Sequence, residues 1–235
     1  MKKNGIKLLI IFLIILICII TFITVKKNRV TNDEKSFKKE YERYNGYTNP
    51  GSDKKYFDVN IEEKNGIKYL DDEVIDMLQN KTGIIYFGFP TCPWCRSMIE
   101  VLLDAKDSTN QKNIYYYNAL DIRDEKVLED GKVKTTKKGK KNYYKILDIL
   151  GDKASVYEGL EDDSIKRLYF PTVVFVRNGK IVDIHISTVD SQEDPYKKLN
   201  KKQKAELKKI YNRGIAKMKG KECDIDTACK KSMKK

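Results

Sequence analysis

Histidine and cysteine are scarce in this chain. Its 235 residues include one histidine, His185, and five cysteines. A structural zinc site takes four nitrogen or sulfur ligands. Cys92 and Cys95 supply half of such a set, but His185 and the two cysteines of the C-terminal tail lie far away along the sequence. We therefore expect no metal and no cofactor, with half of a zinc site as the competing interpretation of the cysteine pair.

The chain also lacks an internal repeat and any recognisable nucleic-acid-binding motif. Its 47 Lys and Arg against 34 Asp and Glu give a net charge of +13. The lysines are spread along most of the sequence rather than gathered into one motif, and an anionic membrane surface or cell wall would attract the same charge. We therefore expect no nucleic-acid partner.

Charged residues are absent from one long stretch, Leu8 to Val25, which lysines flank on both sides. This stretch is long enough to cross the bilayer core. Its last residues offer no small-x-small cleavage site, so a transmembrane signal anchor is favoured over a cleaved signal peptide, and Cys18 is read as apolar filler. A short basic tail, residues 1–7, before such a run usually delivers the rest of the chain outward. We expect a single-pass cell-membrane protein with an extracytoplasmic domain, and a cytoplasmic domain is the alternative.

The remaining sequence divides by composition. Residues 26–60 are charged and rich in turn-forming residues, which predicts a tether without a core of its own. Residues 61–219 are enough for one domain with a proper core. Residues 220–235 form a lysine-rich tail that holds Cys223 and Cys229. We expect these two to form a structural disulfide, and the competing hypothesis is a second dithiol that relays electrons to Cys92 and Cys95.

The most informative motif is Phe89-Pro90-Thr91-Cys92-Pro93-Trp94-Cys95-Arg96. The apolar run 84–89 before it predicts a buried strand, and residues 97–103 after it have helical periodicity. The cysteines therefore open a helix just after a strand. Unpaired backbone N–H groups and the helix dipole favour a thiolate there. Cys92 is the expected nucleophile and Cys95 the resolving partner.

Three motifs in this order resemble those of the thioredoxin-like proteins, over roughly residues 65–215. The first, residues 67–78, reads as a strand and a helix that Asp71 or Asp72 caps. The cysteine motif is the second. The third, residues 169–182, reads as a Pro171-Thr172 strand that turns through Asn178-Gly179 into an antiparallel partner. The resemblance implies an α/β fold with a central mixed β-sheet flanked by helices, and a thiol-disulfide oxidoreductase.

The resemblance also implies residue roles. Pro171 is expected to be cis and to lie beside Cys92 and Cys95, with Phe170 and Trp94 completing a rather apolar substrate-binding groove. Two positions depart from the family or are ambiguous. Tyr86 stands where thioredoxins usually carry a buried aspartate, which suggests slower reduction or another base. Arg96 is read either as solvated surface or as a residue that tunes the thiols.

An insertion at about 123–164 interrupts the pattern. Lys132–Lys141 is basic and predicts an exposed loop, and residues 143–150 predict an amphipathic helix that ends at Gly151. This insertion either borders the active site and selects partners or is a surface elaboration. Residues 196–219 predict a C-terminal helix packed on the sheet.

The sequence thus predicts a membrane-anchored thiol-disulfide oxidoreductase that acts on exported proteins and is served by a membrane or extracytoplasmic redox partner. The direction of electron flow stays open, because uncharged Pro93-Trp94 between the cysteines does not decide it. The alternative is a non-catalytic client-binding module or secretion accessory protein with a structural disulfide.

Overall fold

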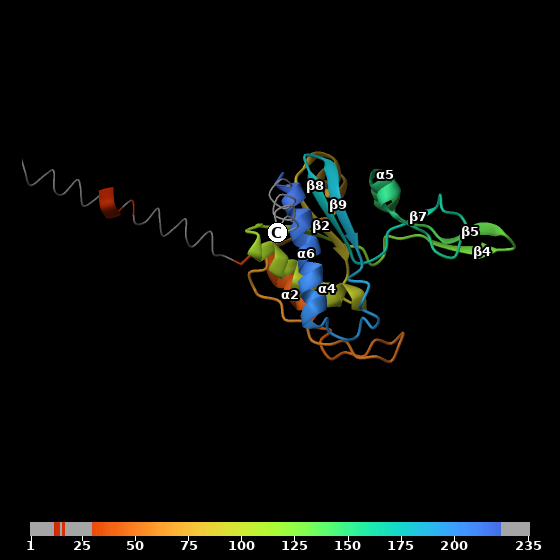
Figure 1. The fold of residues 1–235 in the computed structure, drawn as a ribbon, viewed down its shortest axis with the longest axis horizontal. Helices are drawn as coiled ribbons and strands as arrows, with labels where there is room; N and C mark the ends of the chain where they lie inside the picture. Colours follow the sequence, from red (N-terminus) through yellow and green to blue (C-terminus); the bar gives the residue numbers. More distant parts are fainter. Residues whose placement is uncertain (1–11, 15, 17–29, 222–235) are drawn as a thin grey trace, which may run out of the picture.

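The computed structural model describes residues 12–14, 16 and 30–221, and a five-stranded mixed sheet lies at the centre of this part (Figure 1). The order across the sheet is β1-β3-β2-β8-β9. The strands are β1 (Ile67–Tyr69), β2 (Gly83–Gly88), β3 (Ile114–Asn118), β8 (Thr172–Arg177) and β9 (Lys180–Ile186). The predicted α/β class with a central mixed sheet flanked by helices is confirmed.

Strand directions bring two distant segments to one edge of the sheet. Strands β1 and β2 run parallel to β3, whereas β8 runs antiparallel to β2 and to β9. In this register Phe87, near the end of β2, lies opposite Thr172, the first residue of β8. The segment after β2 and the segment before β8 therefore meet. The predicted Asn178-Gly179 turn joins β8 to β9, and both residues have positive φ, 49° and 71°.

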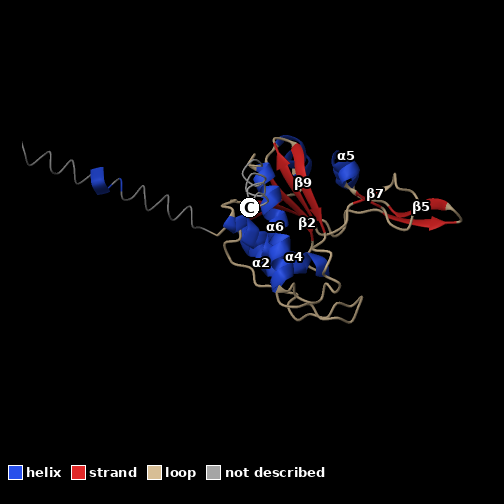
Figure 2. Cartoon of the chain, viewed as in Figure 1, coloured by secondary structure: helices blue, strands red, loops and turns tan. Residues whose placement is uncertain are grey.

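Helices cover both faces of the sheet. On one face lie α2 (Asn32–Glu42), α4 (Pro93–Ser108) and α6 (Lys201–Met218), and on the other lie α3 (Val74–Asn80) and α5 (Lys141–Leu150) (Figure 2). All six residues of β2 are buried. Because successive strand side chains point to opposite faces, Ile84 and Tyr86 pack toward α2, α4 and α6, while Ile85 and Phe87 pack toward α3 and α5.

The prediction of a tether over residues 26–60 is wrong for residues 30–60. Thr31 and Glu34 form a capping box that begins α2. Phe37 and Tyr41, one helical turn apart, are fully buried in the same core cluster as Cys95, and Val59 joins them. Most charged residues of this segment are exposed or partly exposed, although Glu34 is buried, and the few apolar residues cover one face of the sheet.

The insertion contains a projecting hairpin where a loop was predicted over Lys132–Lys141. Strands β4 (Glu125–Glu129) and β5 (Lys132–Lys137) pair through an Asp130-Gly131 turn, and Figure 1 shows them extending away from the sheet. Both turn residues have positive φ, which two-residue hairpins require. The lysines are exposed as expected, but Lys132, Lys134 and Lys137 lie on a strand, and Lys141 begins α5. The predicted helix is α5, and it ends at Gly151, where φ is 51°. The rest of the insertion holds η1 (Gly151–Lys153) and β6 (Ser155–Val156), and β6 pairs with β7 (Lys166–Arg167), just after the insertion.

Other expectations have mixed outcomes. The C-terminal helix, α6, packs on β8, β9 and α4 through buried Leu207, Tyr211 and Ile215, as predicted. The predicted aspartate cap of α3 is wrong, because Glu73 occupies the capping position and makes no side-chain cap bond.

Two predictions fall largely or wholly outside the described residues. Among the residues that are described, none of the helices is both long and apolar enough to span a bilayer. The anchor predicted over residues 8–25 lies outside them apart from residues 12–14 and 16, and so do Cys223 and Cys229.

Candidate active site

The two cysteines lie where β2 passes into α4. Cys92 is the N-cap of α4, and the backbone N–H of Cys95 donates a hydrogen bond to its Sγ at 3.2 Å. Both thiols are free. Cys92 keeps 6% of its surface exposed and Cys95 none. Cys92 is therefore the sulfur that an incoming group can reach, and the helix start directs an N–H group at it.

The segment before β8 closes the site from the other side. The Phe170-Pro171 peptide bond is cis, as the resemblance implied. The carbonyl oxygen of Phe170 lies 3.8 Å from the Sγ of Cys92. This contact follows from the β2–β8 register, which brings the two loops to one edge of the sheet.

Three aromatic residues lie near Cys92 in the chain or across the site. Phe89, Trp94 and Phe170 are partly buried and pack against the core cluster that contains both cysteines. The rings of Phe89 and Phe170 meet edge to face, with their centroids 5.6 Å apart. The surroundings of Cys92 are thus apolar on the sides formed by these three residues.

Arg123 also lies near Cys92, through its contact with Phe170. The sequence analysis did not identify Arg123 as a site residue. Its guanidinium carbon lies 4.6 Å from the centre of the Phe170 ring. Arg123 follows β3 by a few residues, and β3 ends at the same edge of the sheet as β2. The position of Arg123 just after a strand parallel to β2 is the feature of the sequence that could have indicated its place near the cysteines. The first residues of the insertion therefore border the cysteine pair.

Cys95 is packed among tyrosines rather than beside a carboxylate. The hydroxyls of buried Tyr86 and Tyr41 lie 2.6 Å apart. Burial raises the pKa of Tyr41, Tyr86 and Tyr211 well above the ordinary value, so these hydroxyls stay protonated. Burial likewise raises the pKa of Cys95, and its hydrogen bond with Cys92 raises it further, while a hydrogen bond with Tyr86 opposes the rise. Tyr86 thus places a neutral donor where the family resemblance would place an acid.

Arg96 is not solvated surface, because only 1% of it is exposed. Its guanidinium donates to the carbonyl oxygen of Tyr41 at 2.7 Å and to Oδ1 of Asn45 at 2.7 Å. It also donates to the carbonyl oxygens of Phe57 at 3.1 Å and Pro90 at 3.4 Å. Arg96 therefore ties the N-terminal segment to the loop that precedes Cys92.

We expect release of a substrate from Cys92 to accelerate with pH. Because the pKa of Cys95 is raised, its thiolate fraction grows about tenfold per pH unit throughout the neutral range. Release should follow that slope from pH 6 to 9, and Tyr86→Phe, which removes the hydroxyl that lowers the pKa, should slow it at every pH. Stopped-flow decay of a Cys92 mixed disulfide measures the rate, and a rate that does not change with pH would contradict the assignment of Cys95.

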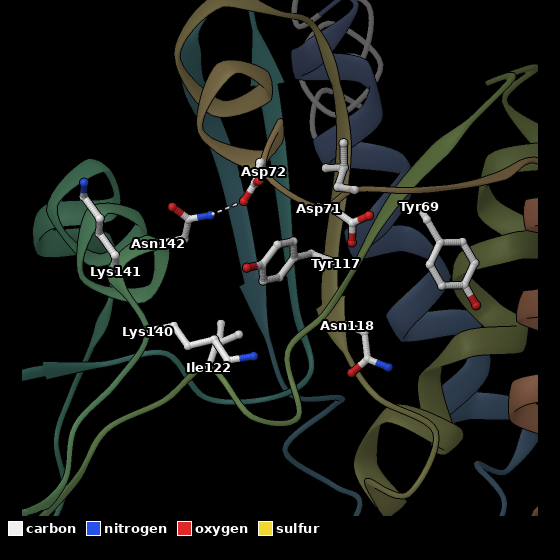
Figure 3. Close-up of a pocket in the computed structure, with 10 residues that line it drawn as sticks. Tyr69, Asp71, Asp72, Tyr117, Asn118, Ile122, Lys140, Lys141 and Asn142 are labelled. Atoms are coloured by element: carbon white, nitrogen blue, oxygen red, sulfur yellow. Dashed lines mark hydrogen bonds between the residues drawn. The ribbon is translucent and has the colours of Figure 1, made fainter.

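A separate polar pocket of about 450 Å³ lies at the same edge of the sheet, between the start of α3 and the start of α5 (Figure 3). Asn142 donates to Asp72 across it at 3.5 Å. The side chain of Tyr117, which belongs to β3, points toward these two residues. Ile122 lines this pocket, whereas the next residue, Arg123, stacks on Phe170. The pocket and the cysteine pair are thus neighbouring features that the beginning of the insertion separates.

In the described part of the chain, no three His, Cys, Asp or Glu residues gather closely enough to hold a metal ion. The fold and the site together define a mixed α/β protein with a reduced cysteine pair at one edge of its sheet, beside a cis-proline. No protein-family model, curated protein or solved structure matches the chain.

Proposed function

We propose that the protein is a thiol-disulfide oxidoreductase of thioredoxin-like fold, anchored in the cell membrane by residues 8–25 and acting on extracytoplasmic proteins. The observation that carries this proposal is the meeting of Cys92, at a helix start, with the cis Phe170-Pro171 segment at one edge of the sheet. The unequal burial of Cys92 and Cys95 supports separate roles for the two sulfurs.

In the reducing direction the thiolate of Cys92 attacks one sulfur of a substrate disulfide. A mixed disulfide forms between Cys92 and that sulfur, and the other substrate sulfur leaves as a thiolate and takes up a proton. Cys95 then loses its proton and attacks the Sγ of Cys92, which releases the first substrate sulfur as a second thiol. Two electrons pass from the protein dithiol to the substrate, and the protein is left with a Cys92–Cys95 disulfide.

The same steps run backward oxidise a substrate dithiol. In this oxidising direction a partner disulfide must regenerate the Cys92–Cys95 disulfide. In the reducing direction a partner dithiol must regenerate the two thiols. In either case the partner is a membrane or extracytoplasmic redox protein. The reduction potential of the Cys92–Cys95 couple decides between the two. A value near about −270 mV indicates a reductant and one near about −120 mV an oxidant.

Replacing Cys92 should abolish the activity. We expect the full-length chain in detergent, with Cys18→Ala, Cys223→Ser and Cys229→Ser as the parent, to reduce insulin disulfides or to reoxidise reduced ribonuclease. Adding Cys92→Ser should lower either rate to background, because Cys95 has no exposed surface from which to replace it.

A matched control comes from the tail cysteines. Restoring Cys223 and Cys229 in the parent should leave the rate unchanged if they form a structural disulfide, and should raise it if they relay electrons. A parent that cycles in neither assay but still binds unfolded clients would favour the non-catalytic binding module.

A further inference from the structure

Arg123, at the start of the insertion, and Arg167, just after its end, contact aromatic residues near cis-Pro171 and form no ion pair with the described residues. Arg123 stacks on Phe170, whose carbonyl oxygen lies 3.8 Å from the Sγ of Cys92. Arg167, on β7, lies 4.2 Å above the ring of Tyr157 and 5.9 Å from that of Tyr169. Within residues 30–221 the ion pairs of the structure include neither arginine.

Arg123 lies close enough to Arg167 and to Cys92 for both to act on its guanidinium group. The pKa of Arg123 is lowered first by burial and then by the charge of Arg167, while Glu125 and Cys92 act in the opposite direction. Both side chains are half-buried. The Nε of Arg167 is buried and makes no hydrogen bond to the described residues. Two partly desolvated cations thus act on each other, and neither forms an ion pair with the described residues.

Aromatic stacking explains why both side chains hold this position. A guanidinium that lies flat on a ring keeps its N–H groups free at its edge, and a carboxylate matches that edge with two parallel hydrogen bonds. The stacking rings of Phe170 and Tyr169 directly precede cis-Pro171. A polypeptide whose cysteine reaches Cys92 therefore passes within reach of these donors.

We propose that Arg123 and Arg167 select clients that carry an aspartate or glutamate next to the reacting cysteine. This inference rests on the proposed function and names its substrate class. The client's carboxylate supplies the ion-pair partner that neither arginine has among the described residues. Glu125 acts on Arg123 without forming an ion pair, and Asp124 pairs with Lys126.

The test uses the reduced parent and short peptide disulfides that differ only in having glutamate, glutamine or lysine on both sides of the cysteine. The second-order rate of mixed-disulfide formation should be about tenfold higher for the glutamate peptide than for the glutamine peptide in dilute buffer. The ratio should shrink at high salt, which screens charge at partly exposed sites. Equal rates for the two peptides would overturn the proposal.

Substitutions locate the preference. Arg123→Gln with Arg167→Gln should bring the ratio of glutamate to glutamine rates close to one, and Arg123→Glu should make the lysine peptide the faster substrate. Arg177→Gln is the matched control, because Arg177 is exposed at the far end of β8 from Pro171, and it should keep the tenfold ratio. A preference that survives the double substitution would contradict the assignment to these arginines.

A neutral disulfide separates this proposal from the one on which it rests. Reaction of the parent with hydroxyethyl disulfide, which carries no charge, measures thiol-disulfide exchange alone. Exchange with hydroxyethyl disulfide but no preference among the peptides would reject the selection of acidic clients and leave the oxidoreductase intact. Failure to react with hydroxyethyl disulfide would reject the oxidoreductase itself.

Discussion

Replacing Cys95 by serine in the parent should leave the protein able to capture substrates but unable to release them. Cys92 keeps its exposed sulfur and the N–H group of residue 95, so the mixed disulfide still forms. No second thiol then lies in position to attack it. We expect turnover to fall at least about 10³-fold, because a reacting group held within the molecule acts at effective concentrations far above those of a free thiol.

Covalent adducts are the measurement. Cys95→Ser expressed in cells should accumulate proteins joined through Cys92, which non-reducing electrophoresis detects and peptide mass spectrometry assigns. The matched control, Cys92→Ser with Cys95 retained, should accumulate almost none, because Cys95 is fully buried. Adducts on Cys95 instead of Cys92, or turnover of Cys95→Ser equal to that of the parent, would show that the roles of the two cysteines are wrongly assigned.

Replacing Arg96 by methionine should destabilise the protein by about 4 kcal/mol. Methionine keeps most of the length of the side chain but donates no hydrogen bond. The carbonyl oxygens of Phe57 and Pro90 lose the donor that Arg96 supplies. The acceptors on Tyr41 and Asn45 lose one of two donors, because they keep the N–H groups of Tyr44 and Val59. Each buried acceptor left unpaired costs about 1–3 kcal/mol, and relief from burying a charge without a carboxylate partner offsets part of the sum.

Urea unfolding of the full-length chain in detergent gives the free energy, and the fluorescence of Trp94, the single tryptophan, reports on the site itself. Arg96→Lys should recover only part of the loss, since one ammonium cannot reach acceptors on several segments. Arg43→Met, at an exposed position on the same N-terminal segment, is the matched control and should change stability by less than about 0.5 kcal/mol. An Arg96→Met protein as stable as this control would mean that Arg96 does not hold the N-terminal segment in place.

Patterns that depend on near neighbours in the chain were readable from the sequence. The strand before Cys92, the helix after it and the Asn178-Gly179 hairpin each depend on a few consecutive residues, and the structure has all of them. The Asp130-Gly131 hairpin carried the same kind of signal, but its lysine-rich flanks were read as a loop. The cis state of Phe170-Pro171 was expected from the family resemblance and not from local chemistry.

The sequence did not show in the same way which side chains of its charged segments are buried. Residues 30–60 have the composition of a tether, yet Phe37 and Tyr41 complete the core, because the face formed by β1, β3 and β2 needs cover. Arg96 is buried for the same reason, since the segment that packs over it supplies three of its acceptors. The composition of a segment averages over all of its residues, whereas its packing depends only on the few side chains that face the core. Composition therefore did not predict that residues 30–60 pack on the sheet.

By itself, the sequence determined that two cysteines open a helix after a buried strand, since three-residue spacing and apolar periodicity are local properties of a chain. Only the tertiary structure decided what surrounds them. The β2–β8 register brings Phe170 to Cys92, and the path of the insertion brings Arg123 onto Phe170. These residues are far apart in sequence, and their proximity depends on how the strands are ordered across the sheet, which no local pattern encodes.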